Sequence, residues 1–323
     1  MTSGSTARPG GIGSLGELLV EFVCTEKDTG NFRVAPYVGP FPSGAPGIFI
    51  DQAARGGART IFSGAVGDDA FGRVLLNRLR EVGVADTLVR TVKGIPTGSA
   101  FVAYNSDNTR EFVFNMAHSA ASGFPVGSEA IEALAAFDLS AFHISGSTLG
   151  NATMATAALE ICRALHDRGV AISFDPNIRK ELLADPSYLE KVKALLAIST
   201  FVLPSAEDAA VLFPGEGFES FSRRLLADGA RHVVLKRGDA GCIGAERGGE
   251  SASVEGHPVE VVDPTGAGDC FCATFVARIV SGASFREALR YANAAGALAV
   301  GKLGPMEGNS SLAEIEAFLA ARP

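Results

Sequence analysis

The sequence lacks the features that mark secreted and membrane proteins. Its five cysteines are an odd number with scattered spacing, so they do not form a disulfide framework and are expected to be buried, reduced thiols. There is no run of about 18 apolar residues, the length that a membrane span needs. The N-terminal residues also lack the apolar core of a signal peptide. These absences predict a cytoplasmic protein.

Positive charge is scarce as well. The 28 lysines and arginines are outnumbered by 36 aspartates and glutamates, and the net charge of −8 argues against nucleic acid or an anionic membrane as a partner. The rest of the composition is that of an ordinary globular protein, with 47% hydrophobic and 20% charged residues. A chain of 323 residues is long enough for one large α/β domain with a small appendage.

Apolar runs of β type recur along the chain, and most are followed by a stretch with helical periodicity. Strands are predicted at 18–23, 60–66, 141–144, 170–174, 200–203 and 232–236. Helices are predicted at 48–54, 71–82, 153–167, 220–228, 285–300 and 312–321. This alternation indicates βαβ units around a mostly parallel sheet, a Rossmann-type three-layer α/β/α core. Residues 1–12 are small, polar and glycine-rich, and are expected to form a disordered tail before a single domain at 13–323.

One part of the chain breaks this rhythm. Residues 97–116 alternate apolar and polar side chains around a turn at 106–109, which predicts a β-hairpin. Residues 30–43 are also extended and rich in turns. Together, residues 30–43 and 95–117 are expected to form a small β-sheet that acts as a lid over a substrate cleft. The exposed face of such a sheet is a common dimer surface, so a homodimer through the lid is expected.

Residues 259–280 (VEVVDPTGAGDCFCATFVARIV) have the pattern of a phosphate-binding segment. A short β run at 259–262 leads to a glycine-containing turn, and an amphipathic helix is predicted at 269–280. Free backbone N–H groups and the positive end of the helix dipole then converge at one point. Gly266 and Gly268 let a ligand oxygen approach the backbone closely. The pattern predicts an anion hole formed by Gly266, Ala267, Gly268 and Asp269.

Asp269 lies beside this anion hole, where a carboxylate would repel a bound phosphate. The placement suits a general base that accepts a hydroxyl proton while the hole stabilises the transferred phosphoryl group. A plain helix N-cap is the structural alternative. The pattern G-x-x-x-x-G-K-[ST] is absent, which excludes a P-loop enzyme. Gly11, Gly13 and Gly16 fit a glycine-rich dinucleotide pattern, but they precede the first predicted strand, so we reject a dinucleotide site there.

With these segments in view, the chain resembles the ribokinase family of carbohydrate kinases, also called the PfkB family. The run D-P-T-G-A-G-D-x-F at 263–271 closely matches the family's C-terminal signature, and the resemblance extends from about residue 14 to the end of the chain. Other matching segments are GELLVE at 16–21, PSGAPG at 42–47, GAVGDDAFG at 64–72, PTG at 96–98, FDPNIR at 174–179 and KRG at 236–238. The resemblance implies a ribokinase-like fold with a lid, and an ATP-dependent sugar kinase that uses Mg²⁺.

The resemblance also implies roles for individual residues. The sugar side includes Glu21, Gly44, Ala45 and Ile48. Two positions depart from the family's sugar loop: Ser43 replaces a glycine and Ile48 replaces an asparagine, which indicates a shifted substrate preference. The nucleotide side includes Ser205, Lys236, Gly238, Gly241, Gly266, Gly268 and Asn293.

The resemblance also implies two metal sites. The family's magnesium motif is altered to Ser205-Ala206-Glu207-Asp208 here, and Asp208 is expected to hold Mg²⁺ through water. Asp263, Thr265 and Gly304 match positions around the family's monovalent-cation site, which takes K⁺.

Four further residues are candidates from their own context. Asn177 and Arg179 follow an apolar strand, at the edge where α/β proteins place ligands, although Arg179 has the alternative of a surface ion pair with Asp175 or Glu181. Arg110 lies in the lid hairpin and His118 follows it. Each is a candidate substrate contact, with a solvated or structural side chain as the alternative.

The sequence therefore predicts transfer of the ATP γ-phosphoryl group to a primary hydroxyl of a sugar, with Asp269 as the base. The hairpin residues at 109–115 resemble those of ketohexose kinases, for fructose or tagatose. A 2-keto-3-deoxygluconate-type sugar-acid kinase is the alternative, with Arg110 or Arg179 facing the carboxylate. Two further functions are compatible with the same fold: a nucleoside kinase and a non-catalytic sugar-binding regulatory protein.

Overall fold

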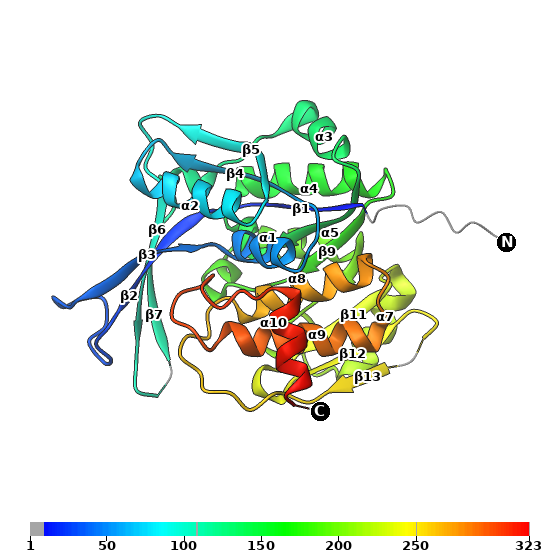
Figure 1. The fold of residues 1–323 in the computed structure, drawn as a ribbon. Coiled ribbons are helices and arrows are strands. Elements are labelled where there is room, and N and C mark those ends of the chain that lie inside the picture. The colour runs from blue at the N-terminus through cyan, green and yellow to red at the C-terminus, as the bar shows by residue number, and fades with distance from the viewer. Residues whose placement is uncertain (1–9, 108, 250, 323) are drawn as a thin grey trace.

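The computed structural model describes residues 10–107, 109–249 and 251–322 (Figure 1). Its centre is a 9-stranded sheet with the order β13-β12-β11-β10-β9-β8-β1-β4-β5. The strands from β5 to β11 in this order pair in parallel, whereas β12 and β13 are antiparallel additions at one edge. The bounds are β1 (Gly11–Leu15), β4 (Thr60–Gly67), β5 (Ala85–Val92), β8 (Leu139–Ser145), β9 (Ala171–Asp175), β10 (Ser199–Val202), β11 (His232–Lys236), β12 (Cys242–Glu246) and β13 (Ser251–Val254).

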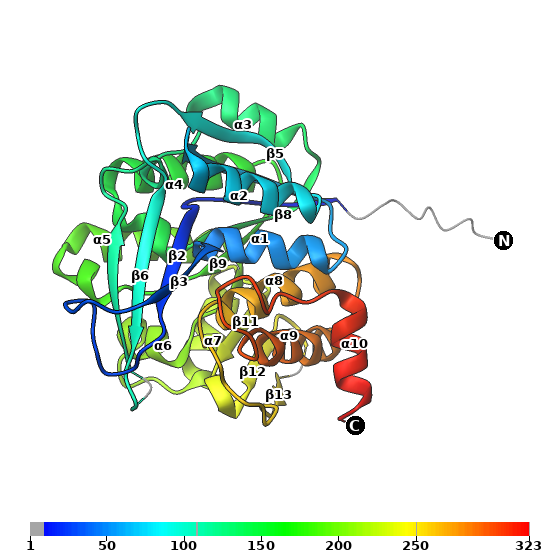
Figure 2. The same cartoon turned by 60° about the vertical axis from the view of Figure 1, so that its left-hand side comes forward.

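Helices cover both faces of this sheet, as the rotated view shows (Figure 2). One face is packed by α1 (Ala45–Arg55), α2 (Ala70–Glu81), α8 (Ala267–Val280) and α9 (Phe285–Ala299), whose apolar side chains form one large buried cluster. A second cluster on the other face is built with α3 (Gly127–Ala135), α4 (Ala152–His166) and α5 (Pro186–Leu196). The remaining helices are α6 (Ala206–Leu212), α7 (Phe218–Asp228) and α10 (Leu312–Ala320). The predicted three-layer α/β/α core is confirmed. In the described part of the chain no helix is both long and apolar enough to cross a membrane.

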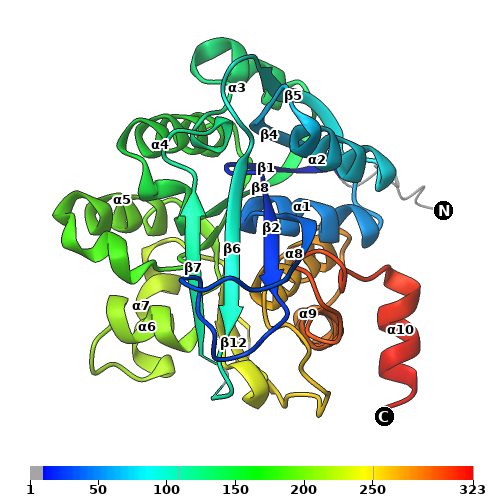
Figure 3. The ribbon, with the colours of Figure 1, turned by 90° about the vertical axis from the view of Figure 1, so that its left-hand side faces the viewer.

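A separate 4-stranded sheet has the order β3-β2-β6-β7. Its strands are β2 (Leu19–Cys24), β3 (Tyr37–Ser43), β6 (Gly98–Tyr104) and β7 (Arg110–Asn115). Figure 3 shows it face on, standing in front of the core, and Figure 1 shows β1 running toward it. We call this sheet the lid. Because β2 follows β1 closely, the lid stands at the carboxyl ends of the parallel strands, where α/β proteins place their ligands.

The N-terminal part of the prediction is wrong in two ways. The strand predicted at 18–23 as the first core strand is β2 of the lid. The first core strand is β1, of which residues 11 and 12 fall in the predicted tail, while residues 1–9 lie outside the described residues. The glycines explain the error, because a glycine-rich segment is typical of a loop. Here they are needed, since a Cβ on Gly11 would lie 2.6 Å from the Phe137 ring and one on Gly13 would lie 2.7 Å from the Phe142 ring.

The prediction of a β run at 259–262 is also wrong. These residues form no strand; the Val262 amide donates to the Val300 carbonyl at the end of α9, and Val261 is 60% exposed. The other predicted helices and strands are found with ends that differ by up to three residues.

The packing of β1 yields a test. Gly13→Val would force a branched side chain against the Phe142 ring, and overpacking of this kind costs roughly 1–3 kcal/mol. We expect the free energy of unfolding in urea to fall by about that amount. Gly123→Ala is the control, because a Cβ there meets its nearest atom at 3.7 Å. Equal stability of the Gly13 variant and the wild type would contradict the close packing of β1.

Candidate active site

The phosphate-binding segment begins at the turn before α8. Gly266 is the N-cap of α8, has φ 84° and makes no side-chain capping bond. A Cβ at Gly266 would lie 2.5 Å from the Pro305 carbonyl oxygen, so this turn requires glycine. The first intrahelical bond runs from the Cys270 amide to the Gly266 carbonyl. The amides of Ala267, Gly268 and Asp269 therefore precede the hydrogen-bond ladder and form the free N–H groups of an anion hole.

The structure corrects the N-cap alternative for Asp269. Helix α8 begins at Ala267, two residues earlier than predicted, so Asp269 is its third residue and caps nothing. The side chain is buried, with 8% of the residue exposed. Burial raises the pKa of Asp269 to about 8, with a further contribution from Asp175, while Lys236 and Arg179 oppose the rise. A carboxylate of this basicity is a better proton acceptor near neutral pH than an ordinary aspartate.

Lys236, expected on the nucleotide side, lies at the end of β11 directly behind the anion hole. Its ammonium is 2.5 Å from Asp175 Oδ2, at the end of β9, and a Cβ on Gly268 would lie 3.5 Å from Lys236 Nζ. The Lys236 side chain is only 12% exposed. The two parallel strands thus deliver a buried ion pair to the same edge of the sheet as the anion hole.

Glu21 on β2 brings a carboxylate from the lid. It is 2% exposed, and its Oε2 accepts a hydrogen bond of 3.1 Å from Ser43 Oγ. Its Oε1 has no hydrogen-bond partner among the described residues. Burial raises the pKa of Glu21 to about 7, and the charge of Asp263 adds to the rise. An unpaired buried acceptor is costly, so Oε1 is ready to accept a hydroxyl of a ligand.

The loop that resembles the family's sugar loop leads into α1. Gly44 is the N-cap of α1 with φ 109°, and a Cβ there would meet the Glu17 carbonyl oxygen at 2.4 Å. Ala45 follows as the first helical residue. Ile48, which stands where the family has asparagine, is 2% exposed and packs with Cys270, Ala299 and Met306. The structure therefore places the Ile48 side chain behind the anion hole and not in the cleft.

The three residues expected to bind a monovalent cation lie together, and the lid reaches them. Asp263 Oδ1 accepts from the Thr265 amide at 2.9 Å, and Oδ2 accepts from the Gly304 amide at 3.0 Å. Tyr104 of the lid donates to Asp263 Oδ1 at 2.6 Å, and Arg110 donates to Thr265 Oγ1 at 3.2 Å. Tyr104 was not predicted, because its partner is 159 residues away in the sequence.

The strand-end residues Asn177 and Arg179 are also at the site. Asn177 has φ 37°; its side-chain amide donates to Ser145 Oγ at 3.1 Å and its backbone amide to Asp175 Oδ1. The ion pairs of the described residues do not include Arg179, so its alternative pairing with Asp175 or Glu181 is absent from the structure. The positive charge of Arg179 instead lowers the pKa of Asp269.

Glu17 is a site residue that sequence reasoning missed, although it lies in the quoted segment at 16–21. It follows β1 and is 5% exposed. Its carboxylate accepts from Ser147 Oγ at 2.5 Å and from Thr148 Oγ1 at 3.0 Å. Burial raises the pKa of Glu17, and its negative charge raises that of Asp269. The chain therefore has acidic groups on both the core side and the lid side of the cleft.

The expected magnesium residue Asp208 belongs to α6. Its Oδ2 accepts from the Ser205 amide at 2.8 Å in a capping box, and its Oδ1 accepts from the Ile178 amide at 2.7 Å. Among residues 10–107, 109–249 and 251–322 there is no cluster of three or more His, Cys, Asp or Glu side chains arranged to hold a metal. Mg²⁺ in phosphoryl-transfer sites is usually held by one or two carboxylates, water and the phosphates, and Asp208 could supply one such carboxylate.

The predicted nucleotide residues lie around the end of β11 and on α9. Gly238 and Gly241 flank the turn after β11, with φ of 58° and 82°. Asn293 on α9 is 8% exposed, and its amide donates to the Glu255 carbonyl at 2.7 Å. The buried amide of Asn293 is thus paired with a backbone carbonyl in the loop that leads to Asp263.

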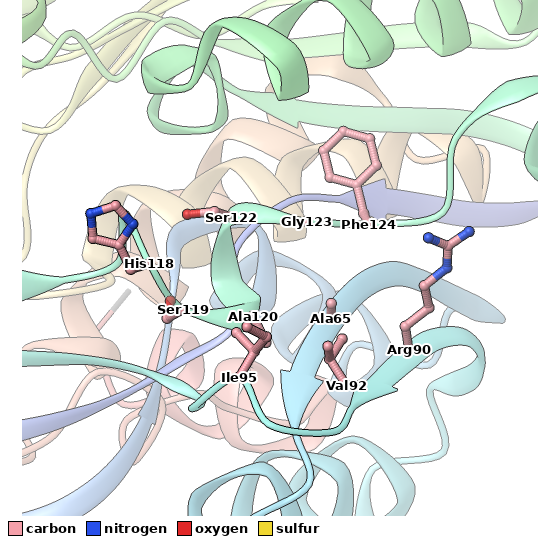
Figure 4. Close-up of a pocket in the computed structure, with 10 residues that line it drawn as sticks. All are labelled: Ala65, Arg90, Val92, Ile95, His118, Ser119, Ala120, Ser122, Gly123 and Phe124. Atoms are coloured by element: carbon pink, nitrogen blue, oxygen red, sulfur yellow. The ribbon is translucent and has the colours of Figure 1, made fainter.

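His118 lies apart from these residues. It lines a hollow of about 390 Å³ beside β4 and β5. Figure 4 shows His118 with the other lining residues, which include Ser119, Ser122 and Arg90. None of the lining residues belongs to the group around Asp269.

Comparisons with known proteins agree with this geometry. A family model described as pfkB family carbohydrate kinase matches residues 12–312. Fructokinase-1 of Oryza sativa subsp. japonica is 32% identical over 305 residues, which cover 90% of this chain and 92% of the relative. Fructokinase-1 of Zea mays is 31% identical over 313 residues, covering 94% and 95%. The chain belongs to the PfkB family of carbohydrate kinases.

Solved structures show the same fold. A protein from E. coli described as "putative Ribokinase II", in complex with ATP and Mg²⁺, superposes with a TM-score of 0.90 at 37% identity, over 97% of this chain and 100% of that one. A fructokinase from Xylella fastidiosa with bound ATP has a TM-score of 0.83 at 23% identity, over 96% and 98%. The fold is ribokinase-like, as the sequence predicted.

The burial of Glu21 yields a prediction for stability. Because the pKa of Glu21 is raised, the folded protein binds more protons than the unfolded chain between about pH 4.5 and 7, so this group lowers stability as the pH rises through that window. Glu21→Gln should therefore raise the free energy of unfolding at pH 8 by about 1–3 kcal/mol and by less at pH 5. Glu111→Gln, at an exposed lid position, is the control. A uniform loss of stability at both pH values would contradict the assignment.

The bond between Tyr104 and Asp263 yields a prediction for substrate use. Tyr104→Phe leaves the buried Asp263 with one donor fewer, a loss of roughly 1–3 kcal/mol. We expect KM for the sugar to rise about tenfold, because the lid loses its link to the phosphate-binding segment, with a smaller change in kcat. Tyr37→Phe is the matched control, since that hydroxyl bonds Asn31 within the same part of the chain. Unchanged steady-state kinetics for Tyr104→Phe would show that the link has no role.

Proposed function

We propose that this protein is an ATP-dependent ketohexose kinase that transfers the γ-phosphoryl group of ATP to a primary hydroxyl of fructose. The observation that carries the proposal is the buried, basic Asp269 beside the free amides at the start of α8. A base at this point accepts the proton of the attacking hydroxyl, and the amides of Ala267 and Gly268 stabilise charge on the transferred group. When bound, Mg²⁺ would neutralise negative charge on the phosphates, and Asp208 would help to hold it.

The acceptor is held on the lid side of the cleft. Glu21 Oε1, buried and without a partner in the described chain, accepts a sugar hydroxyl. The strand ends contribute Asn177 and Arg179, and Arg179 adds positive charge near the transferred phosphoryl group. The lid excludes water from the reaction, which protects ATP from hydrolysis.

Fructose is favoured over a sugar acid by the charges of the site. Glu17 and Glu21 are both buried acidic groups, and a carboxylate on the acceptor would be repelled by them. Arg110, one of the two cations that a sugar acid could use, already donates to Thr265. The names of the plant relatives, both fructokinases, point the same way.

The proposal includes three finer points. Asp263, Thr265 and Gly304 form the surroundings of a K⁺ site. A homodimer forms through the face of the lid opposite Glu21, where Val113 is an exposed apolar side chain. The protein works in the reducing cytoplasm, since its five cysteines are all free and buried.

The test of the function is the release of ADP that depends on an added sugar. Wild-type protein is assayed with fructose, tagatose, ribose, 2-keto-3-deoxygluconate and a nucleoside, and fructose should give the highest kcat/KM. A higher kcat/KM with a different acceptor would contradict fructose as the substrate and identify that acceptor instead. Absence of turnover with the whole panel would favour a non-catalytic sugar-binding protein.

Asp269→Asn tests the base. Removing the proton acceptor should lower kcat about 10³-fold while ATP still binds, as measured by calorimetry. In the wild type, kcat/KM should rise with pH and level off above about 8, because the carboxyl of Asp269 must be ionised to accept a proton. Asp167→Asn, at an exposed position, is the control. Substantial fructose-dependent ADP release by the Asp269 variant would contradict its role.

A further inference from the structure

A buried ion pair behind the anion hole has no part in the reaction as described above. Lys236 and Asp175 lie at the carboxyl ends of β11 and β9, which are separated in the sheet only by β10. Lys236 Nζ is 2.5 Å from Asp175 Oδ2, and the two side chains are 12% and 3% exposed. Two buried charges carry a large desolvation cost, and an apolar pair of similar size is often as stable. Stability alone therefore gives little reason for an ion pair at this point.

The pair is held in one orientation. Lys236 Nζ also donates to Cys272 Sγ at 3.4 Å, and the Cys272 thiol lies 3.5 Å from Asp175 Oδ2. Cys272 is three residues after Asp269 on α8, so both side chains lie on the same face of the helix. Asp175 Oδ1 is fixed in turn by the amide of Asn177 at 3.2 Å. These contacts leave neither charge free to turn away.

The two ends of the pair face different parts of the site. The ammonium is the end nearest the anion hole, because a Cβ on Gly268 would lie 3.5 Å from Lys236 Nζ. The carboxylate is the end that faces α8, because Asp175 Oδ2 lies 3.5 Å from the thiol of Cys272, which is three residues after Asp269. The charge of Asp175 accordingly raises the pKa of Asp269. Both side chains are buried, so solvent screens these interactions little. The charged groups that face Asp269 are Asp175, Lys236, Arg179 and Glu17, with the thiols of Cys270 and Cys272 also adjacent.

We propose that Lys236 and Asp175 are positioning residues that form an oriented charge pair, with the ammonium toward the phosphoryl group in the anion hole and the carboxylate toward Asp269. The ammonium attracts the terminal phosphates of ATP, because Gly268 has no side chain to separate Lys236 from the anion hole. The carboxylate makes Asp269 a stronger proton acceptor. The inference rests on the proposed kinase function and adds two residues to it.

The first test measures nucleotide affinity without sugar, by calorimetry at pH 8. Lys236→Met should weaken the binding of ATP with Mg²⁺ about tenfold, and Asp175→Asn should tighten it several-fold, because they remove opposite charges near the phosphates. Affinity for AMP, which has no terminal phosphates, should stay unchanged in both variants. Lys193→Met on the exposed side of α5 is the control for loss of a positive charge. A change of the same sign in both variants, or an equal loss for AMP, would overturn the proposal.

The second test uses the pH dependence of kcat/KM with fructose. The acidic limb should move to higher pH by about one pH unit in Lys236→Met and to lower pH in Asp175→Asn, as expected for a near charge. A purely structural pair would lower activity in both variants without moving the limb in opposite directions. If either single variant does not fold, the double variant is measured instead, because it buries no net charge. Its ATP affinity should be close to that of the wild type. A tenfold loss of ATP affinity in the double variant would overturn the proposal.

The two tests separate this inference from the function. If the wild type turns over no sugar while the ATP affinities change with opposite signs, the function is wrong and the charge pair stands. If the wild type phosphorylates fructose and both variants change in the same direction, only the charge pair is wrong.

Discussion

The interaction on which the site depends is the repulsion between a polyphosphate ligand and the buried carboxylates that surround it. Glu17, Asp175, Asp208 and Asp269 lie at the carboxyl edge of the sheet, and each is at most 8% exposed. A protein with a net charge of −8 that binds ATP there must supply positive potential locally. The free amides at the start of α8 do so without a side chain, and Lys236 and Arg179 add two cations.

This balance of charge explains how Asp269 can be buried and still serve as the proposed base. Removing water from Asp269 raises its pKa to about 8, and an uncompensated cluster of acids would raise it further. Lys236 and Arg179 limit the rise, so a substantial fraction of the carboxyl remains ionised near neutral pH. Under the proposed function, the same cations face the phosphoryl group. One set of charges therefore serves both the ligand and the base.

The lid couples the two ends of the cleft. Glu21, Ala100 and Phe114 lie opposite one another on neighbouring lid strands, as do Tyr104 and Arg110. These rows place Glu21, Tyr104 and Arg110 on one face, which meets Asp263 and Thr265. Asp263 also raises the pKa of Glu21. Glu21 and the segment from Asp263 to α8, which the proposed function assigns to sugar and phosphate, are thus linked through hydrogen bonds and charge.

The features predicted well from the sequence are those that local chemistry defines. The glycine turn at Gly266 and the helix that carries Asp269 lie within a few residues of one another, and the amphipathic helices carry their own periodicity. The features that were missed depend on contacts between distant segments. Residues 11 and 12, the start of β1, fall in the predicted tail, because nothing local in the sequence shows that the rings of Phe137 and Phe142 pack against Gly11 and Gly13. Lys236 could be expected near the nucleotide, but its pairing with Asp175 follows only from the order of the parallel strands.

The structure also explains the two departures from the family's sugar loop, Ile48 and Ser43. Ile48 fills the space behind the anion hole with Cys270 and Met306, so α1 supports the phosphate side and offers no polar group to a sugar there. Ser43 donates to Glu21 Oε2, which holds that carboxylate and leaves Oε1 without a partner in the part of the chain that the structure describes. An acceptor would then be recognised more by the lid than by α1. The choice of sugar in this chain should therefore follow changes in the lid strands more closely than changes in the loop that precedes α1.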